Sequence, residues 1–81
     1  MGTLNVFVTI VGEEKAETNK LVEELLGMEG VTEAFELSGG LDILLRVTSD
    51  SLSEMNRTME TIRAMDGVKS ADTYLILGRK S

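Results

Sequence analysis

The sequence predicts an α+β fold in which two β-α-β units share one antiparallel sheet. Apolar runs with strand character alternate with amphipathic helical stretches in the order β-α-β-β-α-β. A Met-acid-Gly-Val phrase also occurs twice, at residues 28–31 and 65–68, each time where a helical stretch ends. Two split β-α-β units on a four-stranded sheet, with both helices on one face, make a ferredoxin-like fold.

The first half of the chain predicts a strand, a helix and a second strand. Residues 4–11 (LNVFVTIV) are rich in β-branched residues, as strands are. Residues 13–26 predict a helix that Gly27 and Gly30 end, and residues 31–37 predict the next strand. Three acidic residues suit the positive end of this helix's dipole: Glu13, Glu14 and Glu17. One side of the second strand carries Val31, Glu33, Phe35 and Leu37.

The second half repeats this order. A Ser-Gly-Gly turn precedes the third strand, residues 41–48, which we expect to form a hairpin with the second. Asp50 or Ser51 caps the second helix, and Ser51 with Glu54 makes a capping box. Residues 68–77 predict the last strand. The helix's apolar stripe predicts core packing, although methionines can also line a ligand groove: Leu52, Met55, Met59, Ile62 and Met65.

The two faces of the predicted sheet differ in character. We expect the helices to cover the wholly apolar face, which consists of Val6, Val8, Ile10, Ile43, Leu45 and Val47. The opposite face carries Phe7, Val11 and Leu44, and the last strand adds either Tyr74 and Ile76 or Leu75 and Leu77. A solvated antiparallel face is normally polar, so this face predicts a homodimer interface around Phe7 and Leu44. Alternatively, these two side chains are singly exposed.

Composition excludes several functions. The chain of 81 residues has 14 acidic and 8 basic residues and a net charge of −6, which argues against direct nucleic-acid binding. It has no cysteine and no histidine, so we expect no catalytic residue, no metal site, no cofactor and no enzyme activity. No apolar run approaches the roughly 20 residues of a membrane span, and no signal peptide is visible. We therefore expect a cytoplasmic protein.

The stretch LSGGLDILLRV, residues 37–47, offers the groups that a free amino acid would need. A glycine turn leaves backbone N–H groups free for a carboxylate, and the carboxylate of Asp42 suits an amine. A simpler interpretation is that Gly39 and Gly40 only make a hairpin turn, which Asp42 caps.

Residues 31–47 (VTEAFELSGGLDILLRV) resemble the effector domain of the leucine-responsive regulatory protein/AsnC (Lrp/AsnC) family of transcriptional regulators. The shared pattern is a strand, a hydroxyl-Gly pair, two residues, an Asp and an apolar strand. Residues 62–77 (IRAMDGVKSADTYLIL) are similar to the family's helix end, Gly-Val and Thr-led last strand. Two positions differ: Leu41 replaces a frequent aromatic residue, and Met65-Asp66 stands where the family often has a proline.

This resemblance implies a dimer built sheet against sheet, with dimers assembling further, often into octamers. It also implies a free amino acid as effector, bound in clefts between dimers. Carried over by motif, Gly39, Gly40 and Leu41 would line the site. Asp42 would hold the α-amino group of the ligand, and Thr73 would offer a hydroxyl.

Family members usually also carry an N-terminal helix-turn-helix domain, whereas here the first predicted strand begins close to Met1. We expect residues 1–81 to be one stand-alone effector (RAM) domain without a DNA-binding domain. It would regulate amino acid metabolism or transcription through a partner. One alternative is an ACT-type regulatory module, which pairs its sheets side by side. Another is a ligand-free protein that mixes subunits with a full-length Lrp/AsnC regulator or a metabolic enzyme.

Overall fold

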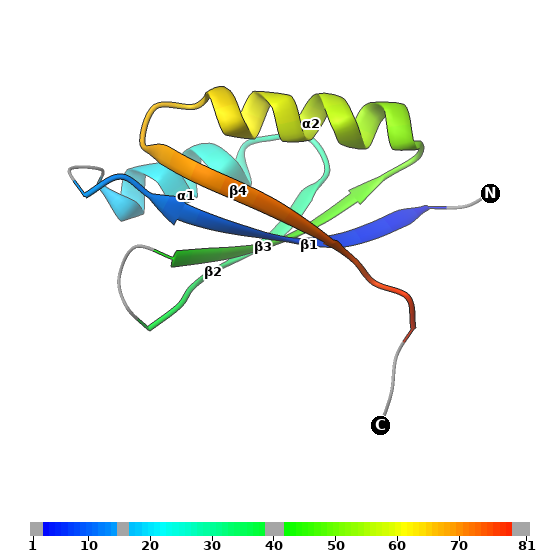
Figure 1. The fold of residues 1–81 in the computed structure, drawn as a ribbon, viewed down its shortest axis with the longest axis horizontal. Helices are drawn as coiled ribbons and strands as arrows, with labels where there is room; N and C mark the ends of the chain where they lie inside the picture. Colours follow the sequence, from blue (N-terminus) through cyan, green and yellow to red (C-terminus); the bar gives the residue numbers. More distant parts are fainter. Residues whose placement is uncertain (1–2, 15–16, 39–41, 79–81) are drawn as a thin grey trace.

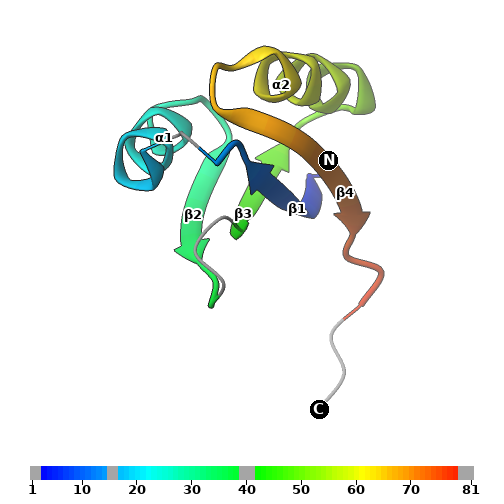
Figure 2. The same ribbon diagram turned by 60° about the vertical axis from the view of Figure 1, so that its left-hand side comes forward.

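The computed structural model describes residues 3–14, 17–38 and 42–78, and its elements follow the predicted order (Figure 1). They are β1 (Leu4–Gly12), α1 (Thr18–Leu26), β2 (Val31–Glu36), β3 (Asp42–Ser49), α2 (Leu52–Ala64) and β4 (Val68–Leu75). The strands form one antiparallel sheet in the order β2-β3-β1-β4. Both helices cover the same side of it, which confirms the ferredoxin-like fold (Figure 2). Neither described helix has the length and apolar character needed to cross a membrane.

The core lies between the helices and the face of the sheet that was predicted to meet them. Alternate residues of β1 and β3 are buried there: Val6, Val8, Ile10, Ile43, Leu45 and Val47. Helix α1 contributes Leu21 and Leu25, and α2 contributes Met55, Met59 and Ile62. The methionine stripe is therefore core, as predicted. Leu52 is the exception, since it is the first residue of α2 and 67% exposed.

Helix α1 begins later than the sequence predicts, at Thr18 instead of residue 13. At residue 13 the chain still continues the line of β1, because the Glu13 N–H donates a 2.8 Å hydrogen bond to the carbonyl of Gly67, which directly precedes β4. The first turn of α1 consequently contains no acidic residue, and Glu17 occupies the N-cap position without a side-chain hydrogen bond. The expectation that the three acids lie in the first turns of this helix is wrong, and Glu17 stands just before it as the N-cap.

Helix α2 begins as predicted, with Ser51 as its N-cap. The Ser51 hydroxyl accepts a 3.1 Å hydrogen bond from the Glu54 N–H, which satisfies one of the free donors of the first turn. The Glu54 carboxylate accepts a 3.5 Å bond from the Ser49 hydroxyl, so it ties the end of β3 to the start of α2. At the other end, Arg63 donates two hydrogen bonds to the Ala71 carbonyl of β4.

The two Met-acid-Gly-Val phrases form the same junction twice. Gly30 and Gly67 both have φ of +93°, and in each phrase the Val N–H donates to the Met carbonyl, at 3.3 and 3.2 Å. Each glycine carbonyl also accepts a 2.8 Å backbone bond, from Thr48 of β3 for Gly30 and from Glu13, just after β1, for Gly67. The phrases therefore join a helix end to the next strand.

Strand β2 carries an irregularity that the sequence did not reveal. Val31 pairs with Val47 of the core face, whereas Glu33 pairs with Arg46 of the other face. Thr32 is the extra residue between them, and its hydroxyl donates a 3.2 Å bond to the Arg46 carbonyl. The expectation that Val31 shares a side with Glu33 is wrong, because this bulge turns the strand over.

The strand ends also differ slightly from the predictions. Strand β3 runs to residue 49 and β2 ends at residue 36. Strand β4 ends at Leu75, two residues earlier than predicted. Leu75 pairs with Val6, close to the first residue of β1, and beyond it the Ile76 N–H donates to the Asn5 carbonyl. The chain then leaves the sheet on the side away from the helices (Figure 1).

Candidate functional site

The predicted ligand turn lies largely outside the described residues. Gly39, Gly40 and Leu41 are not among them, and Asp42 is described as the first residue of β3, where it pairs with Val11. Thr73 lies on β4, exposed, and pairs with Val8. The roles predicted for these residues stay predictions.

Asp42 and Thr73 are not neighbours within one protomer. Strand β1 separates their strands, and their partners Val11 and Val8 are three residues apart on it. With ordinary strand geometry, two strand spacings and three residues of rise place the two Cα atoms roughly 14 Å apart. A small ligand held by both residues would therefore require one of them to come from a second copy of the chain.

The face of the sheet opposite the helices is here called the open face. It includes Val11, as predicted, and two rows of side chains that cross all four strands. The first row is Glu33, Arg46, Phe7 and Tyr74, and the second is Phe35, Leu44, Thr9 and Asp72. Phe7 and Leu44 lie on this face, as predicted from alternation along β1 and β3. The register also settles which side of β4 faces this way, because Tyr74 pairs with Phe7.

Aromatic side chains on both edge strands enlarge the apolar part of the open face. Phe35 on β2 is 45% exposed and Tyr74 on β4 is 57% exposed. Phe35 was not among the residues predicted for the interface. The sequence shows that Phe35 and Glu33 lie on the same side of β2. The bulge at Thr32, which the sequence does not show, places that side on the open face.

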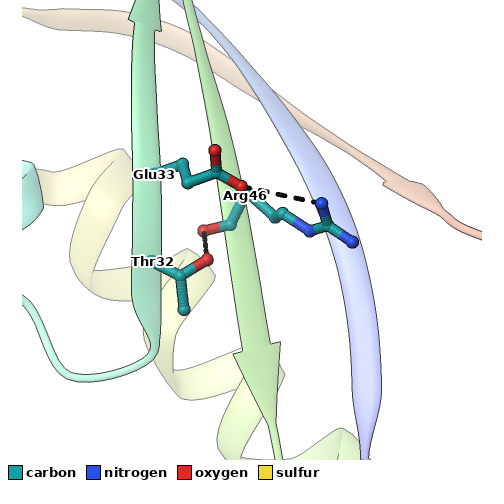
Figure 3. Close-up of polar contacts among 3 residues, drawn as sticks. All are labelled: Thr32, Glu33 and Arg46. Carbon is teal, nitrogen blue, oxygen red and sulfur yellow. Dashed lines mark hydrogen bonds and ion pairs between the residues drawn. The ribbon is translucent and has the colours of Figure 1, made fainter.

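One ion pair lies on the first row of the open face, next to Phe7 and Tyr74. Nη1 of Arg46 is 3.6 Å from Oε1 of Glu33 (Figure 3). The guanidinium carbon of Arg46 is 5.9 Å from the centroid of the Phe7 ring. The Arg46 and Glu33 side chains are 45% and 48% exposed. The guanidinium of Arg46 therefore lies over the Phe7 ring, and about half of each charged side chain is in solvent.

A groove of about 510 Å³ lies at the opposite end of the β2-β3 pair from the predicted ligand turn, between residues 28–30, the end of β3 and α2. Its Thr58 and Thr61 hydroxyls donate 3.1 Å bonds to carbonyls of their own helix. These hydroxyls are thus occupied locally. No group of three or more acidic residues that could hold a metal ion occurs in the part of the chain that the structure describes.

The model of the Lrp/AsnC ligand binding domain family matches residues 3–81. Among solved structures, the chain is similar to an FFRP protein, with 27% identity and a TM-score of 0.82 over 91% of this chain and 99% of the other. It is also similar to the hypothetical protein PHS023 from Pyrococcus horikoshii, with 25% identity and a TM-score of 0.80 over 94% and 92% of the two chains.

A transcriptional regulator from Neisseria meningitidis, solved as a complex with L-Met, shares the fold. The TM-score is 0.80 at 20% identity, and the match covers 96% of this chain and 52% of that one. This chain thus spans about half of that regulator's length. No curated protein matches the chain by sequence.

Proposed function

The chain belongs to the Lrp/AsnC ligand binding domain family, and we propose that it is an oligomeric effector module that binds a free amino acid. Binding would pass a signal to a regulatory partner in the cytoplasm. The observation that carries the proposal is the family match over residues 3–81, which includes the Ser-Gly-Gly-Leu-Asp turn. That turn has no counterpart in the second half of the chain, so the doubled fold does not account for it.

The open face supports assembly into a dimer. Its apolar side chains are contiguous across the sheet, and contiguous apolar patches on small proteins mark interaction sites. A domain of this size buries only about 60–65% of its unfolded surface, so a second copy on this face would add stability that a monomer lacks. Phe35, which is 45% exposed, would contribute roughly 1 kcal/mol on burial.

The chemistry of the turn supports an amino acid as the ligand. Free backbone N–H groups of a glycine turn bind a carboxylate, and Asp42 would hold the ammonium group, so both charged ends of the ligand would be met. The complex of the N. meningitidis regulator with L-Met is a precedent for this ligand class on the same fold. Leu41 would shape the part of the site next to the ligand's side chain.

The ligand is tested by thermal unfolding in the presence of each of the twenty amino acids at millimolar concentration. A ligand at ten times its Kd stabilises the protein by about 1.4 kcal/mol. For a domain of this size, that raises Tm by roughly 6–11 °C. If none of the twenty raises Tm, the amino acid proposal is overturned.

The role of Asp42 is tested with Asp42→Asn, which keeps the size of the side chain and removes its charge. This variant should lose the ligand-induced shift and keep its oligomeric state by native mass spectrometry. Asp66→Asn, at an exposed turn position, is the matched control and should keep the full shift. An Asp42→Asn variant that still responds fully would show that the amine is held elsewhere.

Subunit mixing with a longer regulator is a second candidate. The observation in its favour is that the same fold makes up about half of longer regulators such as the one from N. meningitidis. Such a regulator would then present a comparable sheet to this chain. Co-purification of a longer Lrp/AsnC protein with the tagged chain supports mixing, and recovery of the homo-oligomer alone counts against it.

A further inference from the structure

We propose that Arg46 and Glu33 set the partner and the register of a face-to-face homodimer, with the guanidinium of each copy contacting the Glu33 carboxylate of the other. This inference rests on the proposed dimer and adds the groups that select it. It follows from the place of the pair on the open face, from the donors left free on Arg46, and from the balance of charge.

The pair lies beside the apolar part of the open face, with Glu33 on the edge strand β2. Arg46 is on the inner strand β3, between Phe7 of β1 and Glu33 of β2 in the same row. Phe35 and Leu44 form the neighbouring row. A second sheet that covered these apolar side chains would therefore also cover the ion pair.

The guanidinium of Arg46 has donors to spare. Its contact with Glu33 measures 3.6 Å, longer than the roughly 2.7–2.9 Å of a charge-assisted hydrogen bond. A guanidinium has five N–H donors, and this is the one ion pair that Arg46 makes among the described residues. The guanidinium lies over the Phe7 ring and the side chain is 45% exposed, so its remaining donors are available to a partner.

The open face carries a cation and anions, so the faces of two copies can attract each other. Among its described side chains, Arg46 is the single cation, and Glu33 and Asp72 are the anions. In a two-fold interface, residue i of one copy meets residue j of the other and the reverse contact also forms. One adjacent cation and anion on each copy thus supply two identical cross-interface pairs.

This pair would act on specificity more than on affinity. A buried ion pair roughly breaks even with an apolar pair of similar size, whereas a buried charge without its partner weakens a complex strongly. Without Arg46, the two faces would bring four described carboxylates together with no cation between them. A shift of one copy by one residue along the other would likewise move each carboxylate away from its cation.

A charge exchange tests the proposal by sedimentation equilibrium. Arg46→Glu alone and Glu33→Arg alone each place like charges together, so each should weaken the homodimer by roughly a hundredfold or more. An equal mixture of the two variants should form a heterodimer, because acidic faces then meet basic ones. The double variant Glu33→Arg/Arg46→Glu should again form a homodimer.

Two reversals on the exposed side of α2 are the matched controls, Arg57→Glu and Glu60→Arg, and both should dimerise like the original chain. Circular dichroism checks that every variant is folded. Single variants with unchanged dimer affinity overturn the role of the pair and leave the dimer itself standing. Two monomeric single variants that fail to combine overturn pairing across the interface. An original chain that is monomeric at micromolar concentration overturns both proposals.

Discussion

Replacing Gly30 with alanine should destabilise the domain, because both the backbone conformation and the surroundings of this residue exclude a side chain. Its φ is +93°, which L-residues rarely adopt. An added Cβ would lie 2.6 Å from the Thr48 carbonyl oxygen, which is backbone of the paired strand β3 and has little freedom to move. The clash also acts on the 2.8 Å hydrogen bond from the Thr48 N–H to the Gly30 carbonyl.

The size of the effect follows from these two contributions. A non-glycine residue at positive φ costs about 1–2 kcal/mol. Loss of the hydrogen bond between Thr48 and Gly30 costs about 0.5–1.5 kcal/mol more. A domain of this length has a total stability on the order of 4–12 kcal/mol. Gly30→Ala should therefore remove roughly 1.5–3.5 kcal/mol, a large fraction of the total.

Urea unfolding followed by circular dichroism measures this loss, at one protein concentration for all variants because assembly would affect stability. With a slope of about 1 kcal/mol/M, the midpoint should fall by roughly 1.5–3.5 M. Gly27→Ala is the control, since Gly27 has φ of −77° and an added Cβ would meet nothing closer than 3.4 Å. It should be neutral or stabilise by up to about 1 kcal/mol. Equal midpoints for the two variants would refute the reasoning.

Three further outcomes are expected. Ser51→Ala removes the hydroxyl that caps α2 and should lower the free energy of unfolding by about 1 kcal/mol in the same urea assay. Leu45→Ala, at a fully buried site on β3, should lower it by about 2–5 kcal/mol, and a loss below 1 kcal/mol would contradict the core described here. Phe35→Ser should weaken the homodimer at least roughly tenfold by sedimentation equilibrium. Leu52→Ser, an exposed apolar position on α2, should leave it intact.

The order of elements and the two faces of the central strands could be predicted because both depend on local pattern. Alternation along β1 and β3 separated Val8 and Leu45 from Phe7 and Leu44 without any knowledge of the neighbouring strands. The second glycine phrase then indicated that the two halves are equivalent.

The main features that could not be predicted from the sequence depend on pairing between distant segments. Acidic residues suit both the start of a helix and the end of a strand, so the bond from Glu13 to Gly67 was needed to locate the start of α1. The bulge at Thr32 exists only relative to Arg46, and it places Phe35 on the open face. Tyr74 was assigned to that face only through its pairing with Phe7.

The equivalence of the two halves bears on where ligand binding and assembly take place. The two glycine junctions have the same backbone conformation and the same hydrogen bonds, so the repeat of the β-α-β unit accounts for both. It does not account for the turn before β3 or for the open face. Within one protomer, Asp42 and Thr73 lie two strands apart, so a site that uses both needs a second copy. A ligand held in such a site must bind the assembled form more tightly than the single chain. Linkage then requires assembly to raise ligand affinity by the same factor by which the ligand favours assembly.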